Sequence, residues 1–119
     1  FQTTMCRFIV YHGPAITMAS LVTEPEHAML QLSLKAFCCT TPVNADGFGL
    51  AWYHPEIPVP GAYKDITPAW NNPNLKQIAR AVKSHCFFAH VRAASAGGVN
   101  YPNCHPFMYK NLSFMHNGT

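Results

Sequence analysis

A cysteine that directly follows a methionine, Cys6 after Met5, is the first residue of this chain that is placed for covalent chemistry. If Met5 were removed, Cys6 would carry a thiol and a free α-amino group on one residue. An α-amine titrates near pH ~8 and a thiol near ~8.5, so the amine could accept the thiol proton close to neutral pH. Alternatively, Cys6 is an internal residue that packs as a small apolar side chain, as most free cysteines do. Cys6 alone does not decide between the two.

Arg92 is a second candidate because it ends an apolar stretch, residues 86–92, that is typical of a strand. Alternation along a strand would place Phe88, His90 and Arg92 on one face. An arginine at the end of a buried strand needs an anionic partner, from the protein or from a ligand. The small residues at 93–98 would let a ligand come close. Arg92 is therefore a candidate anion-binding residue.

The elements that must position these residues form a mixed pattern. Residues 5–11 predict a strand that ends at the turn 12–14, and residues 23–26 resemble a capping box that starts a helix reaching about residue 36. Three prolines predict a surface loop at 54–61, and Asn72-Pro73 begins the clearest helix. Further strands are expected at 50–53, 62–66, 86–92 and 112–116. Because βαβ units do not repeat, we expect a layered α+β fold.

Composition excludes several classes of protein. At 119 residues the chain is one domain or part of one, and 49% hydrophobic with only 11% charged residues predicts a folded chain. The net charge of +3 is scattered rather than gathered in a basic patch, so a nucleic-acid partner is not expected. The sequence shows neither a membrane-spanning apolar run of ~18 residues nor a secretory signal, so we expect a soluble, cytoplasmic protein without a membrane partner.

Five cysteines at irregular spacing argue against a disulfide framework and favour a reducing compartment. Seven histidines accompany them, but the sequence contains neither Cys-x-x-Cys nor His-x-x-x-His, and the adjacent pair Cys38-Cys39 is poor geometry for chelating one ion. We therefore expect no metal and no cofactor. A small Cys/His metal-binding module is the lowest-ranked alternative.

The two ends of the chain predict a piece of a larger protein. The first residues, Phe1-Gln2-Thr3-Thr4, are not a normal translation start. The sequence stops at Asn117-Gly118-Thr119 without a following Gly- or Pro-containing stretch of the kind that commonly marks the end of a domain. We expect residues 1–5 to be a leader or a non-native upstream segment. Residues 6–119 are expected to be a partial domain, truncated at its C-terminal end.

Five motifs occur in order along the chain: Met5-Cys6-Arg7-Phe8, Asn44-Ala45-Asp46-Gly47-Phe48-Gly49, Phe88-Ala89-His90-Val91-Arg92-Ala93, Asn103-Cys104-His105-Pro106-Phe107 and Met115-His116-Asn117-Gly118. Together they resemble the class II glutamine amidotransferases, which belong to the N-terminal-nucleophile hydrolases. Residues 63–74 are more specifically similar to the eukaryotic glutathione-degrading subfamily. The chain as a whole looks like the N-terminal half of such a protein.

The resemblance implies a four-layer α-β-β-α sandwich and hydrolysis of the γ-glutamyl amide of glutamine or of a γ-glutamyl peptide such as glutathione. Cys6 would be the nucleophile and would form a γ-glutamyl thioester. Asn117, through its side-chain amide, and Gly118, through its backbone N–H, would form the oxyanion hole, which stabilises the tetrahedral intermediate. A small γ-glutamyl compound is the implied partner, with a second copy of the chain or a peptidase subunit as further possible partners.

The remaining site residues also follow from the resemblance. Arg92 would pair with the α-carboxylate of the substrate, for which a bidentate guanidinium is well suited. Ser95 would lie near that carboxylate, and Asp46 and Gly47 would shape the pocket wall. The histidines of these motifs are interpreted as structural, because the α-amine of Cys6 would act as the base; they are His90, His105 and His116.

The sequence departs from the family pattern at three points that affect its expected activity. Residues 1–5 precede Cys6, so the chain as written should be inactive until they are removed. Ala45 stands where a glycine is usual, and the acidic residues that hold the substrate α-amino group are expected beyond Thr119.

The alternative function is a catalytically inactive scaffold subunit that keeps the fold and binds a partner.

Overall fold

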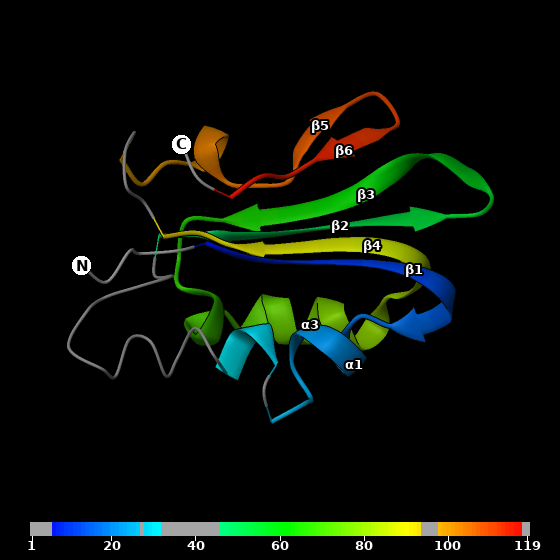
Figure 1. The fold of residues 1–119 in the computed structure, drawn as a ribbon, viewed down its shortest axis with the longest axis horizontal. Helices are drawn as coiled ribbons and strands as arrows, with labels where there is room; N and C mark the ends of the chain where they lie inside the picture. Colours follow the sequence, from blue (N-terminus) through cyan, green and yellow to red (C-terminus); the bar gives the residue numbers. More distant parts are fainter. Residues whose placement is uncertain (1–5, 27, 32–45, 94–97, 118–119) are drawn as a thin grey trace.

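A four-stranded antiparallel sheet is the centre of the fold in the computed structural model of the chain (Figure 1). The structure describes residues 6–26, 28–31, 46–93 and 98–117. In their order across the sheet, the strands are β1 (Arg7–Thr17), β4 (Lys83–Val91), β2 (Phe48–His54) and β3 (Ile57–Asp65). β1 and β3 are therefore the edge strands, and β4 and β2 are paired on both sides.

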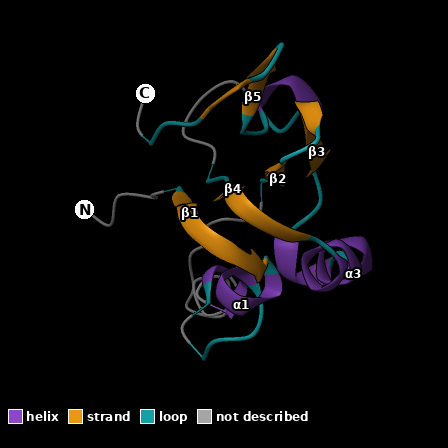
Figure 2. Ribbon diagram, turned by 90° about the vertical axis from the view of Figure 1, so that its right-hand side faces the viewer, coloured by secondary structure: helices purple, strands orange, loops and turns teal. Residues whose placement is uncertain are grey.

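Helices cover one face of this sheet and a small hairpin lies over the other (Figure 2). The helical side includes α1 (Ala19–Val22), the short 3₁₀ helix η1 (Ala69–Asn71) and α3 (Pro73–Ala81). The opposite side carries the 3₁₀ helix η2 (Tyr101–Asn103) and the hairpin of β5 (Phe107–Tyr109) and β6 (Leu112–Phe114). These layers confirm the α+β class that the sequence predicts.

The hydrophobic core lies between the sheet and the helices. In β4, Phe87, Ala89 and Val91 are fully buried in this core, together with Leu50 of β2 and Leu75 of α3. The alternation predicted for residues 86–92 is thereby confirmed, and the other face of β4 is turned toward the hairpin. Burial of this apolar face against the helices supplies the main stabilisation of the sheet.

β1 is longer than the sequence predicts. The expected turn at 12–14 is wrong, because the strand continues to Thr17 and pairs with β4 on both sides of a register shift between His12 and Ile16. Pro14 is tolerated since β1 is an edge strand, where a residue without an N–H breaks no ladder on the open side. The Tyr11 hydroxyl also donates a 2.5 Å hydrogen bond to the Pro14 carbonyl.

The loop expected at 54–61 is likewise wrong over most of its length. Residues from Ile57 onward belong to β3, which pairs with β2 through Trp52↔Gly61 and Ala51↔Ala62. Pro58 and Pro60 lie in the second edge strand, where proline is again tolerated. Proline content alone favours a loop, whereas the open edge that accommodates these prolines exists only in the assembled sheet.

The two predicted helix starts have different outcomes. Asn72 caps α3 as predicted, because its Oδ1 accepts a 3.0 Å hydrogen bond from the Leu75 N–H. Thr23, in contrast, closes the C-terminal end of α1 and does not begin the next helix. Helical geometry resumes only at residues 29–31, and the rest of that expected helix lies outside the described residues.

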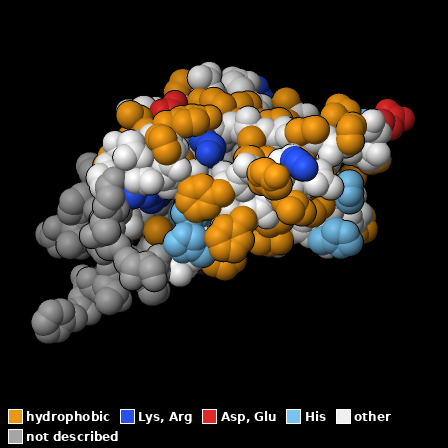
Figure 3. Space-filling model, turned by 90° about the horizontal axis from the view of Figure 1, so that it is seen from above, with side chains coloured by type: hydrophobic (Ala, Val, Ile, Leu, Met, Phe, Trp, Pro, Cys, Tyr) orange, Lys and Arg blue, Asp and Glu red, His pale blue; other side chains and the backbone are white. Residues whose placement is uncertain are grey.

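The face that carries the hairpin has many exposed hydrophobic side chains (Figure 3). Phe8 and Val10 of β1 are 49% and 54% exposed, and they alternate with the buried side of the strand. In the hairpin, Tyr109, Leu112 and Phe114 are also exposed. A second sheet of the expected four-layer sandwich would pack against this face.

Candidate active site

Three chain segments with predicted site residues meet at one end of the main sheet. Cys6 directly precedes β1, Gly47 directly precedes β2, and Arg92 directly follows β4. The registers Arg7↔Val91 and Phe48↔Val91 place these three strand ends side by side. Antiparallel pairing thus brings together residues that are far apart in the sequence.

Cys6 is held by two segments of the chain. Its sulfur accepts a hydrogen bond from the backbone N–H of Ala93 at 3.4 Å and lies 3.5 Å from the Ala93 carbonyl oxygen. The side-chain amide of Asn117 donates a 3.0 Å hydrogen bond to the carbonyl oxygen of Cys6. Cys6 is half-buried, so the thiol is fixed in position without being sealed from a ligand. The predicted nucleophile and the predicted oxyanion-hole residue are therefore in direct contact.

Arg92 is buried and is anchored through its backbone. Its N–H donates to the carbonyl of Gly47 at 2.8 Å, and its own carbonyl accepts from the N–H of Asp46 at 3.2 Å. The guanidinium Nη1 donates a 2.6 Å hydrogen bond to the carbonyl of Gly98. Arg92 thus directly precedes Ala93, whose backbone contacts Cys6, and it brings a positive charge to this end of the sheet.

Gly47 has a backbone conformation that other residues rarely adopt, with φ of +109°. A Cβ at this position would lie 2.7 Å from the Cys104 sulfur and 2.9 Å from the Asp65 carbonyl oxygen. Both the dihedral angle and the close packing therefore require glycine. Cys104 is fully buried, and burial raises the pKa of its thiol, so it stays neutral beside the site.

Three histidines stack behind the site, between β4 and the hairpin. The ring of His105 lies 4.2 Å from that of His90 and 4.6 Å from that of His116, centroid to centroid. His90 is fully buried, and neither of its ring nitrogens has a hydrogen-bond partner within the described residues. Burial lowers the pKa of His90 to about 3 and that of His105 to about 4, so both rings are neutral at neutral pH.

These neutral histidines make the folded state acid-sensitive. In the unfolded chain a histidine binds a proton below pH ~6.5, but folded His90 does not until about 3. The free energy of unfolding is therefore unaffected by His90 above pH ~6.5 and decreases as the pH falls below that value. The slope of this decrease approaches about 1.4 kcal/mol per pH unit for His90. Urea unfolding between pH 7 and 5 measures this slope. We expect His90→Phe to flatten it, whereas His12→Phe, at an exposed position, should leave it unchanged; equal slopes in all three proteins would contradict this assignment.

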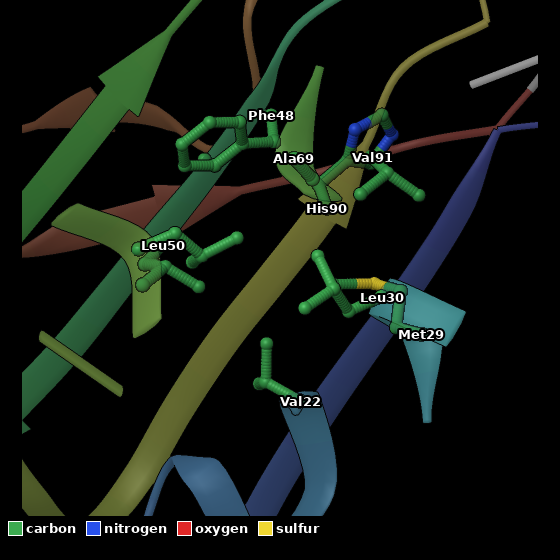
Figure 4. Close-up of a pocket in the computed structure, with 10 residues that line it drawn as sticks. Val22, Met29, Leu30, Phe48, Leu50, Ala69, His90 and Val91 are labelled. Atoms are coloured by element: carbon green, nitrogen blue, oxygen red, sulfur yellow. The ribbon is translucent and has the colours of Figure 1, made fainter. Parts of the chain in front are cut away.

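The pocket drawn in Figure 4 belongs to the hydrophobic core and not to this site. Apolar side chains such as Val22, Leu30 and Leu50 line it from the helical side of the sheet. The ring of His90 points away from these residues, toward His105 on the hairpin side. Among the described residues that line the pocket, none has a polar group positioned to orient a ligand, so we interpret it as a gap in core packing.

The structure thus gathers every predicted site residue that it describes at one end of the sheet. Ser95 and Gly118 lie outside the described residues, as does Ala45. Sequence reasoning did not identify Ala93, whose backbone contacts Cys6 through both its N–H and its carbonyl. Ala93 ends the third motif and begins the small-residue stretch 93–98, but a backbone contact leaves no mark on side-chain type, so its contact with Cys6 is not predictable.

Comparison with known proteins identifies the family of the chain. Residues 18–119 match the family described as "Glutamine amidotransferases class-II", and the chain belongs to this family. The family resemblance predicted from the five motifs is thereby confirmed. Within the described residues, no helix is long and apolar enough to cross a membrane.

Individual relatives are longer than this chain. It is 43% identical over 122 residues to the "Probable glutamine amidotransferase DUG3" of Saccharomyces cerevisiae, in an alignment that covers 96% of this chain and 34% of that protein. It is 28% identical over 119 residues to the "Gamma-glutamyl-hercynylcysteine sulfoxide hydrolase" of Mycobacterium tuberculosis, covering 96% and 49%. The chain therefore spans between about a third and a half of the length of these curated relatives.

A solved structure shares the fold. The glutamine aminotransferase class-II domain protein of Silicibacter pomeroyi superimposes with a TM-score of 0.57 at 30% sequence identity. The match covers 93% of this chain and 34% of that one. The helical layer, the main sheet and the hairpin described above are therefore the architecture of a class II amidotransferase domain.

Proposed function

We propose that this chain provides the nucleophile-bearing part of an enzyme that hydrolyses the γ-glutamyl amide bond of glutamine or of a γ-glutamyl peptide. The observation that carries the proposal is the 3.0 Å hydrogen bond between Asn117 and Cys6, which joins residues 111 positions apart. The membership of the chain in the class II amidotransferase family supports it, as does the name of the M. tuberculosis relative, a γ-glutamyl hydrolase.

The reaction begins at the Cys6 thiol once Cys6 is the first residue. The α-amine takes the thiol proton, and the sulfur bonds to the γ-carbonyl carbon of the substrate while the carbonyl electron pair moves to oxygen. Collapse of this tetrahedral intermediate breaks the carbon–nitrogen bond, and the α-ammonium protonates the departing nitrogen. Water then cleaves the γ-glutamyl thioester, which releases glutamate and restores the thiol.

Asn117 is suited to stabilise the oxyanion of this intermediate. Its side-chain amide has two N–H donors, so one can stay on the Cys6 carbonyl while the other faces the substrate oxygen. A donor that is already fixed in place gains strength when negative charge develops on the oxygen. The backbone N–H of Gly118, the next residue in the chain, would supply the second donor of the oxyanion hole.

Arg92 is suited to select a free α-carboxylate. Its guanidinium is fixed by the hydrogen bond to Gly98, and Arg92 directly precedes Ala93, whose backbone contacts Cys6. In a γ-linked glutamyl group the α-carboxylate is free and lies several bonds from the scissile carbonyl. An α-linked glutamyl group instead presents its free γ-carboxylate at the same number of bonds, with the ammonium group next to the scissile carbonyl.

The proposal is tested by the linkage that the enzyme cleaves. The protein is expressed as its natural full-length polypeptide and is incubated with glutamine, glutathione, and the α-linked isomers of both. Released glutamate is quantified. We expect hydrolysis of γ-linked substrates with a preference of about 100-fold or more over the α-linked isomers, since only the former carry the ammonium group and the carboxylate on one carbon, remote from the scissile carbonyl. Cleavage of both linkages at similar rates, or of neither, would contradict the proposal, and the second result would favour an inactive scaffold.

A further inference from the structure

We infer that His105 is a positioning residue for the oxyanion hole: through His116 it fixes the place of Asn117 beside Cys6. This inference rests on the function proposed above and extends it to a residue that touches neither the nucleophile nor the substrate. The link is a hydrogen bond from the backbone N–H of His116 to Nδ1 of His105, 3.4 Å long.

The hydrogen bond lies immediately beside the catalytic contact. His116 directly precedes Asn117, whose amide donates to the Cys6 carbonyl at 3.0 Å. Both His116 and Asn117 are exposed, and they follow the end of β6 at Phe114. The ring of His116 also contacts the rings of Phe107 and Phe114. Its backbone N–H is held by Nδ1 of His105, and this hydrogen bond lies one residue from Asn117.

His105 itself is well anchored. It is buried, and its ring is packed against His90 at 4.2 Å and against Phe107 at 4.3 Å. Its backbone lies so close to β2 that a Cβ on Gly49 would collide with the His105 carbonyl. Gly49 thus permits the close approach of this segment to the main sheet. Through these contacts the rigid sheet determines where His105 presents Nδ1.

The ring also has the protonation state that the hydrogen bond requires. Nδ1 accepts only when it carries no proton, which requires a neutral ring with its hydrogen on Nε2. Burial lowers the pKa of His105 to about 4, and the charges of His116, Arg92 and Lys64 act in the same direction. At neutral pH the ring is therefore neutral and able to accept.

A matched pair of variants tests the inference in the natural full-length polypeptide. Leucine and asparagine have the same branching, but only asparagine keeps an acceptor oxygen near the place of Nδ1. We expect His105→Leu to lower kcat for γ-glutamyl hydrolysis about tenfold or more with KM within about twofold, because an oxyanion donor acts mainly in the transition state. His105→Asn should recover most of this loss. Equal kcat values for the two variants would overturn the inference.

A double-mutant cycle separates positioning from a general structural role. If His105 acts through Asn117, then His105→Leu should lower kcat by no more than about twofold further when Asn117 is already alanine. Independent effects that multiply in full would overturn the inference, because His105 would then act by another route.

A measurement on the unaltered protein covers the cases in which His105→Leu does not fold or the enzyme has no γ-glutamyl activity. Nitrogen NMR of histidine-labelled protein reports the tautomer of His105 and its coupling across the hydrogen bond to the His116 amide. An unprotonated Nδ1 coupled to that amide shows that His105 holds the His116 backbone, so an absence of hydrolysis would then count against the proposed function and not against this contact. A proton on Nδ1 at neutral pH overturns it.

Discussion

Replacing Cys6 with alanine is expected to reduce γ-glutamyl hydrolysis by on the order of 10⁴–10⁶-fold, as loss of a covalent nucleophile does in other hydrolases. The expected loss is large because alanine leaves no atom to form the thioester. The other thiols that the structure describes, Cys86 and Cys104, cannot replace Cys6, since burial raises the pKa of both and keeps them neutral. Steady-state release of glutamate from glutamine and from glutathione measures the effect.

Cys86→Ala is the matched control for this substitution. Cys86 is half-buried like Cys6, but it pairs with His12 in the middle of β1, away from the sheet end that carries the site. We expect this variant to keep its kcat within about twofold of the unaltered protein. Residual activity of Cys6→Ala within tenfold of the unaltered protein would show that Cys6 is not the nucleophile.

Substitution of Asn117 is expected to have the second largest effect. Asn117→Ala would remove the proposed oxyanion donor, and loss of one such donor typically costs about 10²–10³-fold in kcat, or roughly 3–4 kcal/mol of transition-state stabilisation. KM should change little, because the ground-state carbonyl carries much less negative charge than the oxyanion. Asn117→Asp should be at least as damaging, since a carboxylate donates no hydrogen bond and repels the developing charge. Initial rates over a range of glutamine concentrations separate kcat from KM.

Asn111→Ala is the control for Asn117. Asn111 lies in the hairpin turn between β5 and β6, and its described contact is a backbone carbonyl that alanine retains. This variant should have normal kinetics. A change confined to KM in Asn117→Ala, with kcat intact, would assign Asn117 to ground-state binding and would remove it from the oxyanion hole.

The parts of the fold that the sequence predicts well depend on local chemistry. The start of α3 is predictable because Asn72 and Pro73 determine it within one turn. The alternation of β4 is predictable because apolar and polar positions repeat with the period of a strand. The edge strands are harder, since Pro14 and Pro58 break strands in isolation and are tolerated only where the assembled sheet leaves an open edge.

The features of the site also divide into those that the sequence indicates and those that depend on the assembled fold. The residue types and positions of Cys6 and Arg92 make them candidates from the sequence alone, whereas the role of Asn117 follows only from the family resemblance. The hydrogen bond between His105 and His116 is not predictable from the motifs, because it depends on how closely the hairpin segment approaches β2. Likewise, the motifs favour structural histidines, but they do not reveal that one of these histidines supports the backbone beside Asn117.

The central claim is that Cys6 is an N-terminal nucleophile for γ-glutamyl groups, and one measurement tests it most directly. The natural full-length protein is analysed by intact mass and N-terminal sequencing, before and after treatment with a glutamine-analogue electrophile that alkylates thiols. We predict a mature chain that begins at Cys6 and gains a single adduct, which is absent in Cys6→Ala. A chain that retains Met5 before Cys6 and gains no adduct would contradict the claim.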